Sequence, residues 1–582
     1  MKSLLSLKKY FYRYKTKLLL GVLFILISNL GNVYLPLILK DSVNALQKRA
    51  DYSQLIRYGE LIALISLVSG VFLYLKRQTM IVASREIEYD LRQDFWQHIQ
   101  KLSLRYFQNH STGDIMAHAT NDLNAVRTFV GPAVMYSVDT IVTLVLVLSI
   151  MLSLNVSLTI YSLLPLPLLS YLVYRLGGLI HIKFTRIQEK FSELTTKSQE
   201  NFSGIRVIKS YVREENEIKE YKTLSHDYFN KNMDKVKIEA LFQPVLFFVI
   251  GISLIVVIWI GGLKVINGTM DLGEILAFVV YLGLLIWPMI AVGWVVNLIQ
   301  QASASMKRLN KMFEEDYEIQ DNELTDHKIK EIKGKIEFKN VSFRYGENLP
   351  YVLRNISLEI PQGCTVAIIG HTGVGKTSFI NLIPRLYDVT EGEVLIDGRN
   401  IKHMPLNILR KHIGIVPQET FLFSDTLANN ITYGLSENKM EIVESVSEIS
   451  QLKKDVESFP KGFETMLGER GITLSGGQKQ RTCLARALAI DPNILILDDS
   501  FSAVDTHTEE EILKRLKAYM KDRTSIIISH RISTVKDADK IFVLDKGVIA
   551  EQGTHDELVQ KQGIYADLHY KQLLEKELEE LN

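Results

Sequence analysis

The sequence predicts an all-α membrane domain of six helices with long cytoplasmic helical extensions, followed by an α/β domain with a helical subdomain. Three observations predict this division. Long apolar runs fill the first half of the 582 residues, charged stretches without glycine or proline separate some of them, and short β-branched runs broken by glycine begin near residue 335. A chain of this length exceeds what one hydrophobic core serves. We expect a membrane domain at 1–316, a linker at 317–334 and a second domain at 335–582.

Charge-poor runs predict the membrane spans. About 20 helical residues cross the roughly 30 Å hydrocarbon layer. The first run has no charge and no small-residue cleavage pattern, and further runs follow it, so it is a retained anchor and not a signal peptide. The second is the weakest, because Glu60 and Lys76 bracket its apolar part. The six predicted spans are about 18–39, 61–83, 129–153, 157–176, 241–263 and 275–300.

Lysine and arginine predict the orientation, because cytoplasmic segments near spans hold an excess of them. The segment 175–240 is rich in both, whereas the connection near Asn155 has neither and 264–274 holds only Lys264. Both termini are therefore expected to be cytoplasmic, in a plasma membrane. The basic residues ahead of the first span are Lys2, Lys8, Lys9, Arg13, Lys15 and Lys17.

The cytoplasmic segments between spans predict long helices that continue out of the bilayer. Neither 77–112 nor 205–243 contains glycine or proline. An apolar helical face recurs at i, i+3, i+7 and i+10, which predicts that the extensions pack as a bundle in water. Its members are Phe184, Ile187, Phe191 and Leu194.

Charge and cysteine content exclude several classes. Lys plus Arg is 67 and Asp plus Glu is 66, so the net charge of +1 provides no basic field for nucleic acid. The two cysteines, Cys364 and Cys483, cannot form a disulfide framework or a zinc site by themselves, and both are predicted to be small buried apolar residues.

The second domain contains a P-loop. A β-branched run at 365–369 leads into a glycine-rich loop and then an apolar helical pattern, the context that the motif requires. Its backbone N–H groups can converge on phosphate oxygens, Lys376 can reach the β and γ phosphates, and Thr377 can ligate Mg²⁺. We therefore expect an α/β P-loop ATPase domain that binds ATP and Mg²⁺. The residues expected at the nucleotide are Gly370, His371, Thr372, Gly373, Val374, Gly375, Lys376, Thr377 and Ser378.

A P-loop needs a second carboxylate on the magnesium side, at the end of a buried strand. The run 493–497 is apolar after Asn493 and ends at Asp498. Asp498 is therefore predicted to be the Walker B aspartate and a magnesium ligand.

Leu474 to Gln478 read LSGGQ, and here the sequence resembles the nucleotide-binding domain of ATP-binding cassette (ABC) transporters. With six spans ahead of the cassette, the resemblance covers essentially the whole chain and points to exporter half-transporters of the multidrug and lipid-flippase type. No cysteine-peptidase domain precedes the first span, which disfavours the peptide-processing branch. The signature residues implied at the nucleotide are Ser475, Gly476, Gly477 and Gln478.

The resemblance implies four further roles. Tyr345 is similar to the aromatic that stacks on adenine, although it could also be an ordinary strand tyrosine. Gln418 resembles the Q-loop glutamine, which senses Mg²⁺ and the attacking water. Asp505 resembles the D-loop aspartate, and His530 the switch histidine at the γ phosphate.

Other segments resemble the parts that join cassette and membrane domain. Residues 465–471 are similar to the exporter X-loop, which includes Glu469 and Arg470. Residues 111–122 and 200–211 fall where the family places its coupling helices.

One residue departs from the family pattern. After the Walker B aspartate, the family has a glutamate that polarises the attacking water, and here the residue is Asp499. A displacement on the order of 1 Å can cost about a hundredfold in rate, so a slow site is expected. A compensating backbone shift would instead leave a normal site.

The family binds ATP between the P-loop of one cassette and the signature of another, so the resemblance implies a dimer. An intact signature beside a short carboxylate resembles one subunit of the heterodimeric bacterial multidrug exporters, and a homodimer is the alternative. We expect ATP-driven export of hydrophobic or amphipathic small molecules across the plasma membrane. A homodimeric lipid or peptide exporter, and a regulatory membrane ATPase without transport, are the competing functions.

Asp139 is the single acid in the third span. A charge there is costly, so it should face the bundle or a wet cavity. It is expected either to contact a cationic or polar cargo or to be a hydrogen-bonded packing residue.

Overall fold

The computed structural model describes residues 2–49, 51–468, 471 and 473–580. Its internal contacts divide the chain into two compact units. The membrane unit runs up to Gln97 and resumes at Gly113–Glu314, and the C-terminal unit joins His98–Thr112 to the chain from Glu315 onward. The segment 98–112 thus folds with residues more than 200 positions further along the chain.

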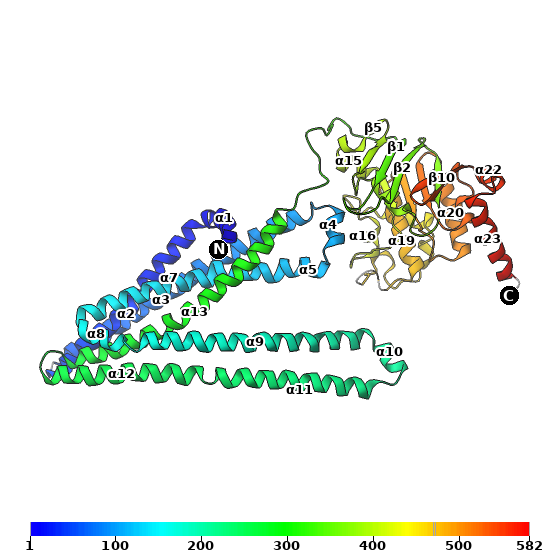
Figure 1. Cartoon of the computed structure of the whole chain (residues 1–582). Helices are drawn as coiled ribbons and strands as arrows, with labels where there is room; N and C mark the ends of the chain where they lie inside the picture. Colours follow the sequence, from blue (N-terminus) through cyan, green and yellow to red (C-terminus); the bar gives the residue numbers. More distant parts are fainter. Residues whose placement is uncertain (1, 50, 469–470, 472, 581–582) are drawn as a thin grey trace. The chain divides into compact units, whose positions relative to one another are not determined.

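The membrane unit is helical throughout its regular structure (Figure 1). Pro36 and Pro288 lie inside long helices. Two π-helical turns, His118–Asp122 and Phe129–Ala133, interrupt the helical stretch that leads into the third predicted span. Its helices are η1 (Lys2–Leu7), α1 (Lys8–Arg13), α2 (Lys15–Gln47), α3 (Tyr52–Ile99), α5 (Thr112–Ala117), α6 (Leu123–Thr128), α7 (Val134–Leu154), α8 (Val156–Leu163), α9 (Leu166–Ser203), α10 (Ile205–Ser210), α11 (Glu214–Glu239), α12 (Phe242–Ile266) and α13 (Leu272–Phe313).

Five helical stretches in the described part of the chain are long and apolar enough to cross a membrane: 15–47, 52–99, 112–154, 214–266 and 272–313. The second stretch, 52–99, contains the predicted span 61–83, which has the weakest apolar pattern of the six. The predicted span at 157–176 is instead divided between α8 and α9 around Pro165, which cannot donate to a continuous helical ladder. Both parts pack on α12, so together they form the return path predicted there.

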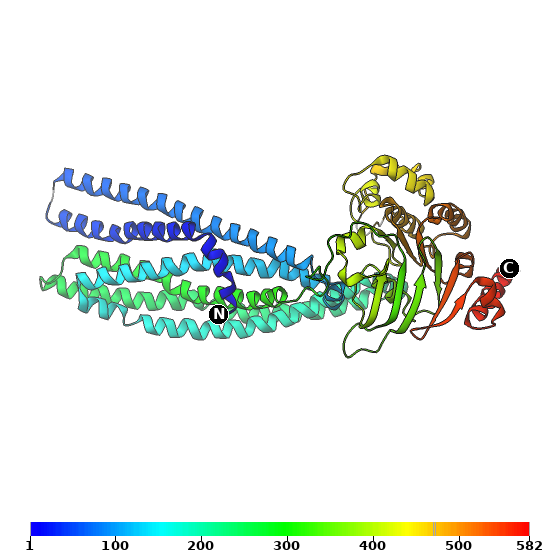
Figure 2. The same ribbon diagram turned by 90° about the horizontal axis from the view of Figure 1, so that it is seen from above.

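Apolar side chains from five helices form the core of the bundle. It contains Val33 of α2, Met151 of α7 and Phe278 of α13, each at most 2% exposed. The hydroxyl of Tyr281 donates to the carbonyl of Val33 over 2.8 Å, which satisfies a phenol that is otherwise fully buried. Seen from above, α2 and α3 (blue) lie along one side of this bundle (Figure 2).

Asp139 lies in a buried polar cluster made by three membrane helices. Its Oδ1 is 2.7 Å from Nζ of Lys76 on α3 and 3.0 Å from Nδ2 of Asn29 on α2. Lys76 and Asn29 are only 6% and 5% exposed. Of the two roles expected for Asp139, these contacts are the ones expected of a hydrogen-bonded packing residue.

The helical extensions continue beyond the apolar runs, but each predicted segment is interrupted: α3 ends at Ile99 within 77–112, and a turn separates α10 from α11 within 205–243. Helix α3 continues to Ile99, and ion pairs join it to the N-terminal helices at Lys17–Glu86, Arg13–Asp90 and Lys9–Asp94.

Helices α9 and α11 form an antiparallel hairpin with α10 at its tip (Figure 1). On the predicted apolar face of α9, Ile187 and Leu194 are buried, while Phe184 and Phe191 remain about half exposed. The predicted bundle is thus only a two-helix hairpin within this chain.

The C-terminal unit contains two sheets. The larger has strand order β10-β9-β3-β8-β7-β6, in which only β10 is antiparallel. The smaller is antiparallel, with order β2-β1-β4-β5. The strands are β1 (Ile336–Phe343), β2 (Leu353–Ile360), β3 (Thr365–Ile369), β4 (Glu391–Ile396), β5 (Arg399–Asn400), β6 (Ile413–Val416), β7 (Ile494–Asp498), β8 (Thr524–Ile528), β9 (Lys540–Asp545) and β10 (Val548–Gly553).

The period of two along the central strands divides the core into two layers. Ile494 and Ile496 pack on one side of the sheet with the small sheet's residues, whereas Leu495 and Leu497 pack on the other side with the helices. Those helices include α16 (Leu427–Ile431), α17 (Met440–Ile449), α19 (Gly476–Ala489), α20 (Thr506–Met520), α21 (Ile532–Val535), α22 (His555–Gln560) and α23 (Ile564–Glu580). The other helices of the C-terminal unit are α4 (Leu104–Asn109), α14 (Lys376–Leu382), α15 (Leu406–Lys411), α18 (Lys453–Val456) and the 3-10 turns η4 (Ile401–His403) and η5 (Gly462–Glu464).

The cysteines differ from each other. Cys483 is buried on α19, as predicted. Cys364 is only half-buried, because it lies in the turn between β2 and β3, so the prediction of burial is wrong for it.

The segment 98–112 is held by the chain that follows α13. Arg105 pairs with Glu318 at 2.7 Å, and Ser103 Oγ donates to the same carboxylate over 2.9 Å. The imidazole of His98 is hydrogen-bonded to the hydroxyl of Tyr317 at 2.7 Å.

Candidate functional site

Four predicted site segments meet at one edge of the larger sheet. Strands β3, β8, β7 and β6 are parallel neighbours, so their carboxyl ends lie together. Beyond these ends come the P-loop after β3, Gln418 after β6, Asp498 and Asp499 at the end of β7, and His530 after β8. Ligands of open parallel sheets bind at this edge.

The P-loop backbone needs glycine at particular places. A Cβ atom on Gly370 would lie 2.2 Å from the carbonyl oxygen of Leu544, so no side chain fits there. Gly373 has φ +84°, in the left-handed region that favours glycine. The loop then enters α14 at Lys376.

Lys376 is held inside this loop. Its Nζ donates to the carbonyls of Gly370 and His371, both at 2.8 Å, and the residue is 7% exposed. Burial lowers the pKa of the ammonium, and the carboxylates of Asp498 and Asp499 oppose that shift. The charge is therefore already positioned where loop N–H groups would meet a phosphate.

Thr377 and Asp498 provide two adjacent oxygens. The Thr377 hydroxyl donates to Oδ2 of Asp498 over 3.0 Å, and Asp498 is 3% exposed. Burial raises the pKa of Asp498, and Asp499 raises it further, while the bond from Thr377 lowers it. Hard divalent cations such as Mg²⁺ prefer such oxygen ligands, so the pair fits the predicted metal position.

The backbone of Asp499 is fixed. Its N–H donates to the carbonyl of Ile528 at 2.9 Å, and its φ is +46°, which is uncommon for a residue other than glycine. The residue follows the paired strands β7 and β8, in which Asp498 lies opposite Ile528. The main chain at Asp499 is therefore tied to the neighbouring strand β8.

His530 lies within electrostatic range of the P-loop and of Asp499. Burial is the main cause that lowers the pKa of its imidazole, followed by the charge of Lys376. Asp499 acts in the opposite direction, and His371 adds to the lowering. The imidazole is therefore favoured in its neutral form near pH 7.

Tyr345 lies beside the start of α14. Its hydroxyl is 2.8 Å from Oγ of Ser378, and its ring packs edge-on to Phe343 and Tyr387, with centroids 4.9 and 5.3 Å away. The ring is thus part of an aromatic cluster next to the P-loop and is more than an isolated strand residue.

Gln418 is exposed, two residues after the end of β6. Its neighbour strand β7 ends at Asp498, so the two residues belong to the same edge of the sheet. Of the remaining P-loop positions, His371, Thr372 and Gly373 are exposed, and Val374 and Gly375 are half-buried.

The signature forms the N-terminus of α19. Ser475 caps the helix, with its Oγ accepting from the N–H of Gln478 and its own N–H donating to the Gln478 side chain. Gln478 also donates to Asp455 over 3.1 Å. Gly477 packs against the D-loop, since a Cβ there would lie 2.9 Å from the carbonyl oxygen of Ala503. Across the described chain, no hydrogen bond or ion pair joins Ser475 or Gln478 to the P-loop.

Asp505 caps α20 by accepting from the N–H of Thr508 at 2.9 Å. Its carboxylate is thus tied to its own helix in this chain. In the segment similar to the X-loop, Met466 pairs with Thr426 and Leu467 donates to Asp425. The predicted Glu469 and Arg470 lie outside the described residues.

Gln480 is a site residue that the sequence reasoning missed. It is 5% exposed, and its side chain donates to Ser502 and accepts from the N–H of Ala503, each at 2.9 Å. It thus joins the signature helix to the D-loop. Its position two residues after Gln478 was the only available signal, and sequence alone does not show that a glutamine is buried.

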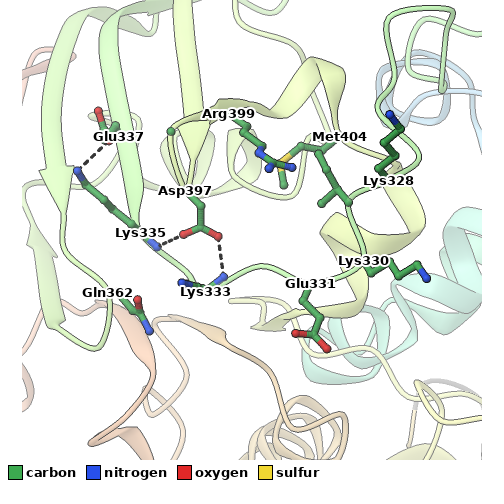
Figure 3. A pocket seen from close by; sticks show the side chains of 12 residues that line it. Lys328, Lys330, Glu331, Lys333, Lys335, Glu337, Gln362, Asp397, Arg399 and Met404 are labelled. Carbon is green, nitrogen blue, oxygen red and sulfur yellow. Dashed lines mark hydrogen bonds and ion pairs between the residues drawn. The ribbon is translucent and has the colours of Figure 1, made fainter.

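A surface hollow of about 670 Å³ lies elsewhere on the C-terminal unit, between the chain at 328–335 and the β4–β5 turn (Figure 3). There, Asp397 accepts from the N–H groups of Lys333, Gly334 and Lys335, which ties the connecting chain to the small sheet. None of the predicted nucleotide residues lines it.

Comparison with known proteins agrees with this arrangement. Residues 18–289 match the family "ABC transporter transmembrane region", and residues 353–502 match "ABC transporter". A "Probable multidrug resistance ABC transporter ATP-binding/permease protein YheI" of Bacillus subtilis is 36% identical over 97% of this chain and 96% of its own. An "ATP-dependent lipid A-core flippase" of Syntrophus aciditrophicus is 37% identical over 89% of this chain and 86% of its own.

Among solved structures, a bacterial Atm1-family ABC exporter with ATP bound superposes with a TM-score of 0.80. It is 26% identical, and the match covers 96% of this chain and 99% of the other. The predicted fold class and the resemblance are confirmed. The chain belongs to the ABC transporters, as a membrane-spanning exporter whose ATP-binding domain couples ATP hydrolysis to transport.

Proposed function

We propose that this chain is one subunit of a dimeric multidrug exporter, that it moves hydrophobic or amphipathic small molecules across the plasma membrane, and that its own ATP site is the slow one of a heterodimer. Residues 1–316 are the membrane domain, 317–334 the linker and 335–582 the ATPase domain. Both termini lie in the cytoplasm of a bacterium, beneath its plasma membrane, because the basic segments flank that side.

The nucleotide roles follow from the edge of the sheet. Lys376 binds the β and γ phosphates together with the loop N–H groups, and Tyr345 stacks on the adenine. Thr377 and Asp498, 3.0 Å apart, hold Mg²⁺, which neutralises phosphate charge when bound. Gln418 would contact the metal and the attacking water, and Asp499 and His530 would act on the γ phosphate.

A dimer is supported by two features. The signature at Ser475 and the P-loop make no hydrogen bond to each other in the described chain, so a second cassette is needed to close each ATP between them. In addition, the tip of the α9–α11 hairpin leaves apolar side chains exposed, which a second subunit would cover. They are Phe202, Ile205, Val207, Tyr211 and Val212, at 45–83% exposure.

The slow site is supported by the fixed backbone of Asp499. Its N–H is bound to the carbonyl of Ile528 and its φ is +46°, contacts that oppose a backbone shift to replace the missing methylene. A displacement on the order of 1 Å costs about a hundredfold, or roughly 2.7 kcal/mol at 1.36 kcal/mol per decade. The second subunit would then supply the fast carboxylate.

The cargo class is supported by relatives such as YheI, whose name includes multidrug resistance. Lipid is a second candidate, because another relative is named a lipid A-core flippase. The two cargo classes share an apolar body and differ in the polar headgroup.

The test is reconstitution in liposomes of the chain alone and with candidate half-transporter partners. Transport of cationic dyes, neutral drugs and fluorescent lipids is measured with ATP hydrolysis, and Lys376→Ala is the control. The proposal expects drug transport and fast hydrolysis only with a partner. Lipid transport without drug transport would favour the second candidate, and fast drug-stimulated hydrolysis by the chain alone would reject the heterodimer.

A further inference from the structure

The loop that carries His530 is held from behind by the last helix of the chain. His530 lies between β8 and α21, and the described residues make no hydrogen bond to its imidazole. The ring position therefore depends on the backbone of residues 530–532. That backbone is in turn bound by two side chains from distant helices.

The first of these side chains is Gln572 on α23. Its Oε1 accepts from the N–H of Ile532 at 2.8 Å, and its Nε2 donates to the carbonyl of His530. One amide thus binds the backbone on both sides of Arg531, with its oxygen as acceptor and its nitrogen as donor. Such a bidentate contact fixes the direction of the backbone as well as its place.

The second is Glu509 on α20. It is 3% exposed and accepts from Arg531 and from the hydroxyl of Thr534, the latter at 2.6 Å. Glu509 holds the far side of the same loop. Because Asp505 caps α20 one turn earlier, this contact also joins the loop to the D-loop.

Helix α23 has its own anchor in the domain. Tyr565 is fully buried in the core, and the N–H groups of Ile564 and Tyr565 donate to Glu551 on β10. The hydroxyl of Tyr565 is 2.7 Å from Nδ1 of His555 on α22. Gln572 therefore projects from a fixed base and not from a free tail.

We infer that Gln572 is a positioning residue for the switch histidine, and that docking of α23 sets how well His530 reaches the γ phosphate. The inference rests on the proposed role of His530. It adds a residue outside the family motifs, 42 positions away in the chain, to the hydrolytic machinery.

The test replaces Gln572 by Met, which has a similar length and no amide. Single-turnover hydrolysis at this chain's own P-loop is followed in the purified dimer, with photoreactive ATP identifying the chain. We expect the rate constant to fall about threefold to tenfold, because the net effect of one or two hydrogen bonds corresponds to that range. The affinity for ATP should be unchanged. Gln572→Glu keeps the acceptor for Ile532 and loses the donor, so its rate should lie between those of Gln572→Met and wild type.

Two comparisons separate positioning from simple stability. Lys571→Met changes an exposed neighbour on the same helix, which pairs with Asp567, and should behave as wild type in rate and melting temperature. In the His530→Ala background, Gln572→Met should cause no further loss, because the group that it positions is gone.

The outcomes are distinct. A Gln572→Met rate equal to wild type, beside an impaired His530→Ala, would overturn the inference and leave the proposed site intact. An equal loss in the His530→Ala background would show a structural role and also overturn it. A silent His530→Ala would reject both the proposed role of His530 and this inference.

Discussion

The hydroxyl of Thr377 lies 3.0 Å from the carboxylate of Asp498, which joins the end of the P-loop to the end of β7. The carboxylate is almost fully buried, and Asp499 follows it directly in the chain. Two acids thus stand next to each other at the proposed nucleotide and cation site. Without a cation, the buried charge of Asp498 is costly.

Asp498→Asn should therefore have opposite effects on stability and on binding. The folded state raises the pKa of Asp498, so folding favours its protonated form, and the stability associated with that proton is lost as pH rises. At pH 7 the neutral amide should raise the melting temperature of the nucleotide-free protein. Binding of magnesium nucleotide should weaken at least about tenfold, because a charged ligand is lost.

Differential scanning fluorimetry with and without magnesium nucleotide checks both effects. The control is Asp537→Asn, an exposed acid paired with Lys517 at 3.4 Å, which should change neither. A lower melting temperature for nucleotide-free Asp498→Asn would contradict the assigned cost of burial.

Hydrolysis at this chain's own P-loop should keep its rate on mild acidification. Because burial and the charge of Lys376 lower the pKa of His530, the imidazole stays neutral at pH values where an ordinary histidine is half protonated. The acid limb of the rate profile should thus begin below about pH 6.5. His530→Gln should have a lower rate and lose that limb in single-turnover hydrolysis at this chain's own P-loop, followed from about pH 5 to 8, because steady-state turnover comes mainly from the other site.

His569→Gln is the matched control for this profile. Burial also lowers the pKa of His569, but it lies on α23 beside His555, away from the P-loop. If the acid limb survives in His530→Gln and disappears in His569→Gln, the titrating group is His569, and the prediction for His530 is wrong.

The sequence predicted best what a contiguous motif encodes. The P-loop at 370–377 needs only a strand before it and a helix after it, and the structure has β3 and α14 there. Long-range partners could not be predicted, because no local signal links Asp139 to Lys76, 63 residues earlier. In the sequence, Lys76 marks only the edge of a weak span. The division at Pro165 was likewise hidden within an apolar run, and the burial of Gln480 depends on a D-loop that follows it.

The cluster of Lys76, Asp139 and Asn29 should be structural. Asp139→Asn leaves a buried ammonium without its charge partner, and removing one member of a buried pair costs roughly 3 to 5 kcal/mol. Lys76→Met with Asp139→Leu removes both charges and should recover most of the lost stability. The measurement is thermal unfolding of the purified protein in detergent for both singles and the double.

Transport assays separate this role from cargo recognition. In a structural role, Asp139→Asn lowers transport of cationic and neutral compounds to the same extent. A selective loss of the cationic compounds, in a variant that melts like wild type, would instead assign Asp139 to the substrate path.

The signature and the Walker B neighbour should behave oppositely in the intact heterodimer. If Asp499 makes this chain's site slow, the fast site uses the partner's P-loop together with Ser475 to Gln478 of this chain. Ser475→Ala should then lower steady-state hydrolysis by about a hundredfold or more, because a preorganised donor to the γ phosphate is lost. The change also removes the cap of α19, so its effect on melting must be measured beside the rate.

Asp499→Asn in the same heterodimer should change turnover by less than about twofold, because that site contributes little of the total. Asp499→Glu is the informative reverse change, since it restores the missing methylene on a backbone held by Ile528, and it should add a second working site. Steady-state hydrolysis with labelled nucleotide identifies the site that turns over. Fast hydrolysis by the chain purified alone, abolished by Asp499→Asn, would show that the short carboxylate is a working base and that the exporter is a self-sufficient homodimer.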